Sequence, residues 1–81
     1  MILAAIIDYL ISLGYVHHYG HIDCLHGPMR HGPNEFWAIE LYLTSDNLQY
    51  DLATGEYGSF EYADPDFFDK IAELTATGRI T

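Results

Sequence analysis

Basic residues are scarce in this chain of 81 residues, in which three Lys and Arg stand against twelve Asp and Glu, a formal net charge of −9. Proteins bind DNA, RNA and anionic membranes largely through Lys and Arg side chains that neutralise phosphates. The charge balance therefore excludes direct binding to nucleic acid or to a membrane surface through a basic patch. The complementary partner is a basic protein.

Cysteine and long apolar runs are also scarce. Cys24 is the single cysteine, which excludes an internal disulfide. The apolar run at the start of the sequence ends at Leu13 and contains Asp8. It is too short to span a bilayer and lacks the basic start and cleavage site of a signal peptide. We expect a cytoplasmic protein in which this run forms a buried helix.

Apolar and aromatic residues are plentiful, at 49% and 15% of the chain. That content lies far from the signature of disorder. A chain of this length has room for one hydrophobic core, so we expect residues 1–81 to form a single domain.

Helical periodicity occurs at both ends of the chain. Apolar residues recur through 2–13 and Gly14 provides a stop signal. That helix is apolar around most of its circumference, so we expect other parts of the protein to cover it on more than one side. A homodimer, in which a second copy covers the helix, is an alternative. A second helix is predicted after Asp64 and Pro65, which suit an N-cap and the first helical position, with Gly78 as its end.

Between the helices, strict alternation predicts three antiparallel strands at 36–43, 48–52 and 56–62, joined by turns at 44–47 and 53–55. These turns predict the register, which pairs Leu43 with Leu48, Leu41 with Tyr50, Ile39 with Leu52, Leu48 with Phe60 and Tyr50 with Gly58. Residues 15–19 suit a short strand, and the glycines and prolines of 23–34 predict an exposed loop.

The predicted fold is therefore α+β, a two-layer domain with an antiparallel sheet of three to four strands and both helices packed on one face. The same register places Glu40 beside Asp51 and Tyr57 on the opposite face, and Glu61 opposite Asn47. Like charges opposite one another destabilise a sheet. From residue 46 to residue 73 the sequence has eight acidic residues and only Lys70 as a basic one.

A solvated face that only keeps the protein in solution would explain this pattern. We favour a surface that binds a basic protein, since carboxylates can occupy the Lys and Arg that otherwise neutralise phosphates and Tyr is favoured in interfaces. In size and charge alone, the chain is similar to the small acidic anti-restriction and anti-CRISPR inhibitors of phages. The expected function is inhibition of a nucleic-acid-handling complex, and the candidate partner-binding residues are Glu40, Tyr42, Asp51, Glu56, Tyr57, Glu61, Asp64 and Asp66.

All five histidines lie close to Cys24, within residues 17–31. His and Cys are zinc ligands, and the spacing of His21, Cys24, His26 and His31 is compatible with a tetrahedral site. No Cys-x2-Cys pair supports it. The alternative function is a small zinc-binding module; otherwise these histidines are hydrogen-bonded residues of a polar loop, or respond to pH at an interface. No cofactor other than zinc is suggested.

Catalytic patterns are missing from the sequence. A nucleophile and base could be drawn from Cys24 and His26, but no nucleophile elbow or phosphate loop accompanies them. We therefore expect a binding protein and not an enzyme.

Overall fold

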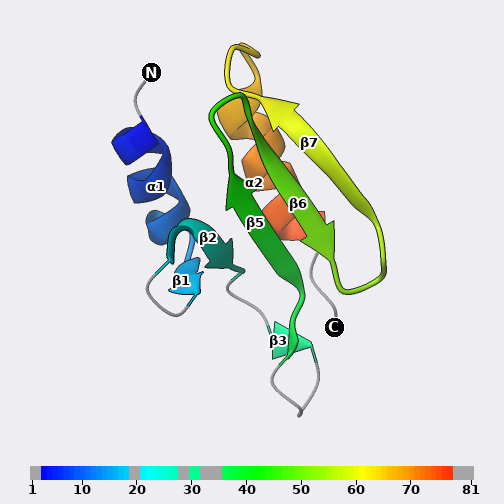
Figure 1. Ribbon diagram of the computed structural model, residues 1–81. Helices are drawn as coiled ribbons and strands as arrows, with labels where there is room; N and C mark the ends of the chain where they lie inside the picture. Colours follow the sequence, from blue (N-terminus) through cyan, green and yellow to red (C-terminus); the bar gives the residue numbers. More distant parts are fainter. Residues whose placement is uncertain (1–2, 19–20, 28–29, 32–35, 78–81) are drawn as a thin grey trace.

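The computed structural model describes residues 3–18, 21–27, 30–31 and 36–77 (Figure 1). Two helices enclose seven short strands in the chain order α1 (Leu3–Ser12), β1 (Val16–His18), β2 (His21–His26), β3 (Arg30–His31), β4 (Phe36–Trp37), β5 (Ile39–Leu43), β6 (Asn47–Leu52), β7 (Tyr57–Glu61) and α2 (Phe67–Thr77).

The main sheet has five antiparallel strands in the order β1-β2-β5-β6-β7, and β3 pairs with β4 in a separate ribbon. In Figure 1, α2 lies behind β5, β6 and β7, while α1 lies beside β1 and β2. The helices meet where the Tyr9 ring packs edge-on against Phe68, with centroids 5.0 Å apart. The predicted α+β architecture is confirmed, with five strands in place of the expected three to four.

The predicted register of the β5-β6-β7 meander is confirmed at every pair. Leu41 lies opposite Tyr50, and Tyr50 lies opposite Gly58. A Cβ on Gly58 would come within 2.6 Å of the Tyr50 hydroxyl, so the tyrosine ring occupies the space that glycine leaves. Gly55 has a φ of 97°, the left-handed conformation that the second turn requires.

The loop expected over residues 23–34 was wrong at 23–26 and 30–31, which lie in β2 and β3, while residues 28–29 and 32–34 lie outside the described residues. Residues 21–26 form β2, an inner strand of the sheet, in which Leu25 pairs with Leu41 and is fully buried. Gly27 is not a simple breaker either. Its amide donates to the Ile39 carbonyl, and an added Cβ would lie 3.0 Å from the Ile39 Cβ. Glycine is therefore needed here because two backbones approach closely.

The strand expected over 36–43 is divided at Ala38. Phe36 and Trp37 pair with β3, and β5 begins only at Ile39. Ala38 is buried, and its carbonyl accepts a hydrogen bond from the Ala53 amide. The chain therefore joins the main sheet only at Ile39, the residue that pairs with Leu52.

The helix boundaries agree with the expected signals with one shift. Gly14 ends α1 with a φ of 102°. The Asp64 side chain accepts a hydrogen bond from the Asp66 amide in a turn, and α2 begins later than expected, at Phe67. The stop expected at Gly78 lies outside the described residues. Neither helix in the described part of the chain has the length and apolarity needed to cross a membrane.

The core lies between the helices and one face of the sheet. α1 contributes Ile6 and Leu10, while Ile11 is 44% exposed, so this helix is covered less completely than the sequence suggested. Tyr15 is buried and its hydroxyl lies 2.8 Å from Thr75 Oγ1. Since the Thr75 hydroxyl donates to the Ile71 carbonyl, Tyr15 is the donor in this pair. The other buried residues of this core, among those described, are Leu25, Ala38, Ile39, Leu41, Leu43, Leu48, Phe67, Ile71 and Leu74.

Replacing Tyr15 with Phe removes this buried hydrogen bond. We expect the free energy of unfolding to fall by about 1 kcal/mol, the usual net contribution of such a bond, measured by urea denaturation. Tyr57→Phe is the matched control, since Tyr57 is 80% exposed and should change stability by less than about 0.5 kcal/mol. Equal effects from the two substitutions would contradict this role for Tyr15.

Stability should also fall at alkaline pH. Burial raises the pKa of Tyr15 above its ordinary value of about 10. The stabilisation from neutral Tyr15 is then complete below pH about 10 and is lost as pH rises through the folded-state pKa, because the unfolded chain ionises first. Denaturation curves between pH 9 and 11 should show a steeper loss for the wild type than for Tyr15→Phe.

Candidate functional site

The face of the sheet turned away from the core, here called the outer face, is built by the cross-strand register. One row of paired residues crosses all five strands, and a second crosses four. Glu61 on β7 lies opposite Asn47 further along the same face. The first row is Val16, His26, Glu40, Asp51 and Tyr57, and the second is Cys24, Tyr42, Gln49 and Ser59.

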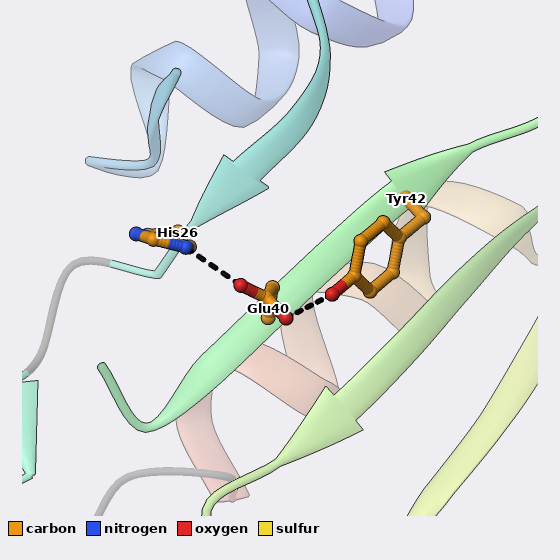
Figure 2. A network of polar contacts seen from close by, with 3 residues as sticks. All are labelled: His26, Glu40 and Tyr42. Atoms are coloured by element: carbon orange, nitrogen blue, oxygen red, sulfur yellow. Dashed lines mark hydrogen bonds and ion pairs between the residues drawn. The ribbon is translucent and has the colours of Figure 1, made fainter. Parts of the chain in front are cut away.

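On the outer face, a polar network joins β2 to β5 (Figure 2). His26 Nε2 lies 2.7 Å from Glu40 Oε2, and the Tyr42 hydroxyl donates to Glu40 Oε1. The side chains of His26 and Glu40 are 13% and 33% exposed. The His18 ring lies close by, with its centroid 4.3 Å from that of His26. Both oxygens of Glu40 are thus engaged by neighbours on its own face.

The network fixes the ionised state of Glu40. Burial alone would raise the pKa of Glu40, but the hydrogen bonds from Tyr42 and His26, together with the nearby imidazoles, hold it below its ordinary value. The same hydrogen bond with Glu40 raises the pKa of Tyr42 far above its ordinary range. Glu40 is therefore a carboxylate held in place by Tyr42 and His26.

The other predicted partner-binding residues fall into two groups. Asp51, Tyr57 and Glu61 are exposed on the outer face, and Glu56 is exposed in the loop between β6 and β7. Asp51 and Tyr57 also line a shallow hollow whose other walls are Tyr42, Gln49, Tyr50, Gly58 and Ser59.

Asp64 and Asp66 lie apart from the outer face, in the turn before α2. The Asp64 carboxylate accepts hydrogen bonds from Lys70 Nζ and from the Asp66 amide, and these lower its pKa. Asp64 thus serves the start of α2, whereas the Asp66 side chain is exposed.

Of the four predicted zinc ligands, the structure describes the side chains of His21, Cys24 and His26. Among the described residues, the group whose ligand atoms lie within 4.8 Å of one another is His18, His26 and Glu40, and it shares only His26 with the prediction. His21 is exposed, and its carbonyl accepts a hydrogen bond from His17 Nδ1. The side chain of His31 lies outside the described residues.

Cys24 is on the outer face opposite Tyr42 and is buried. Burial, with the negative charges of Glu40 and Asp23, raises the pKa of its thiol. The thiol form is the weaker metal ligand and nucleophile, which fits its place outside the three-residue group.

Sequence reasoning missed His18 and the pairing of His26 with Glu40, because residues 21–26 were not recognised as a strand. The signal was present: Ile22, Cys24 and His26 alternate with Leu25, whose side chain faces the core. Comparison of the chain with known protein families, with curated proteins and with solved structures finds no match.

Replacing Tyr42 with Phe removes the hydrogen bond to Glu40 Oε1. We expect the pKa of Glu40 to rise toward its ordinary value, since this bond is the strongest influence that lowers it. The measurement is a ¹³C NMR titration of the Glu40 carboxyl in buffer containing a chelator. Tyr57→Phe, on the same face but outside the network, should leave the titration unchanged. An unshifted Glu40 in Tyr42→Phe would show that the network does not hold this charge.

Proposed function

We propose that this chain is a binding protein whose outer face docks on the basic surface of a nucleic-acid-handling protein and thereby inhibits it. The observation that supports the proposal is the composition of that face. Its exposed residues include Asp51, Tyr57 and Glu61, and none of the outer-face residues in the described part of the chain is Lys or Arg.

Lys70 does not neutralise the outer face. Lys70 is the single Lys or Arg whose side chain the structure describes, and it lies on α2, paired with Asp64. On the strands, Asp51 lies between Glu40 and Tyr57, and Glu61 lies opposite Asn47, so no described neighbour in the sheet brings a Lys or Arg to either carboxylate. A basic partner would supply the missing counter-charges.

Tyr57 adds the apolar part of a binding surface. It is 80% exposed, although an aromatic side chain of this size gains stability from burial. It stands beside Asp51 in the same row and borders the shallow hollow. Aromatic residues surrounded by polar ones are typical of interface anchors, so we expect Tyr57 to be buried by the partner.

The sheet alone is smaller than a standard interface. The strands are spaced about 4.8 Å apart; four have five to six residues and β1 has three. The projected face is therefore at most roughly 350 Å², whereas stable complexes bury about 800 Å² per partner. The contact would therefore extend past the sheet to Glu56 in the β6-β7 loop and to Asp66 before α2. Both of these residues belong to the acidic segment 46–73.

A basic groove that binds nucleic acid does so through Lys and Arg that neutralise phosphates. Carboxylates held on a rigid sheet would occupy the same side chains, so binding of the two ligands would be mutually exclusive. Inhibition by competition with nucleic acid follows from that exclusion.

The test compares proteins captured from a lysate by the wild type and by two triple variants. One variant neutralises the outer-face region with Asp51→Asn, Glu56→Gln and Glu61→Gln. The control neutralises three exposed helix residues with Asp8→Asn, Asp69→Asn and Glu73→Gln. Both variants remove three negative charges, so a difference between them reports on the face and not on the net charge.

We expect the wild type and the control to retain nucleic-acid-binding proteins, the outer-face variant to lose them, and added DNA or raised salt to release them. Equal capture by the two variants, or a captured set without basic or nucleic-acid-binding proteins, would overturn the proposal.

A further inference from the structure

Three strands bring metal-ligating side chains together at one corner of the outer face. His18 comes from β1, His26 from β2 and Glu40 from β5, and their ligand atoms lie within 4.8 Å of one another. All three side chains are of intermediate exposure, neither fully buried nor free in solvent. Figure 2 shows the His26 ring and the Glu40 carboxylate directed toward each other across the gap between β2 and β5.

The donor set suits zinc. Two imidazole nitrogens and one carboxylate oxygen form a recognised three-residue set for Zn²⁺, with the fourth tetrahedral position left to water or another ligand. Metal bonds of about 2.0–2.1 Å place tetrahedral ligand atoms about 3.3 Å apart. The 2.7 Å between His26 Nε2 and Glu40 Oε2 would widen slightly on binding, and His18 would close in from within 4.8 Å. Small side-chain rotations provide both changes.

The backbone and a neighbouring hydroxyl hold these ligands. His26 and Glu40 are paired residues in adjacent strands, so their separation is set by the sheet. Gly27, directly after His26, packs against Ile39, directly before Glu40. The Tyr42 hydroxyl donates to Glu40 Oε1, which leaves Oε2 directed at His26. Hydrogen bonds of this kind orient carboxylate ligands and increase metal affinity.

We propose that His18, His26 and Glu40 bind one divalent ion of the zinc type, with Glu40 Oε2 as the oxygen ligand and Tyr42 as a positioning residue. The ion would replace the direct hydrogen bond between His26 and Glu40 and would tie β1, β2 and β5 together. The ligands lie at the β1-β2-β5 end of the outer face, whereas Glu61 lies on β7 and Glu56 in the loop before it, so zinc binding and docking can be tested separately.

The test is calorimetric titration of the chelator-treated full chain with ZnCl2, and with MgCl2 as the control ion. We expect one zinc per chain and much weaker magnesium binding, since imidazole favours zinc and magnesium prefers oxygen ligands. His18→Ala, His26→Ala and Glu40→Gln should each weaken zinc binding more than tenfold, and Tyr42→Phe about tenfold. The matched controls His17→Ala and His21→Ala should stay within about twofold of the wild type.

Wild-type NMR spectra with and without zinc give a second readout that needs no variant to fold. Zinc should shift the imidazole signals of His18 and His26 and the carboxyl signal of Glu40. No saturable zinc binding would overturn the proposal. Shifts centred on His17 and His21, or equal losses of affinity in the ligand and control variants, would also overturn it.

Discussion

The antiparallel register of β2, β5, β6 and β7 determines which side chains enter the core and which face solvent. Side chains alternate between the two faces of a sheet. The register that buries Leu25, Leu41 and Leu48 therefore also determines which side chains lie together on the outer face. A slip of one residue in any pair would bring charged side chains into the core. The hydrophobic core thus decides which residues lie on the outer face.

That outer face has two ends with different chemistry. At the β2-β5 end, both oxygens of the Glu40 carboxylate are engaged, by His26 and by the Tyr42 hydroxyl. At the β6-β7 end, Asp51 and Glu61 are exposed, with uncharged Tyr57 and Asn47 opposite them on the neighbouring strand. An acidic face was expected from the sequence as a single surface. The structure divides it into an ordered polar corner and an open acidic region, and the two proposals follow that division.

The sequence carried strong information where each strand contributes several core residues. Alternation through Leu41 and Leu43, with Gly55 at the turn, is enough to place the meander and its register. β2 was missed because Leu25 is its one fully buried side chain that pairs within the core, and Gly27 looked like a breaker although it serves a close backbone contact. The candidate site was therefore predicted only in part. Glu40 was identified from the register, but its partners His18 and His26 depend on strand pairings that sequence patterns alone did not define.

The register places His26, Glu40, Asp51 and Tyr57 in one row, and both proposed surfaces depend on it. Cross-strand nuclear Overhauser effects between backbone protons measure that register directly. We expect contacts between Leu25 and Leu41, Leu41 and Tyr50, and Tyr50 and Gly58. Contacts displaced by one residue between β2 and β5, such as Leu25 with Tyr42, would put His26 and Glu40 on opposite faces and would contradict this row.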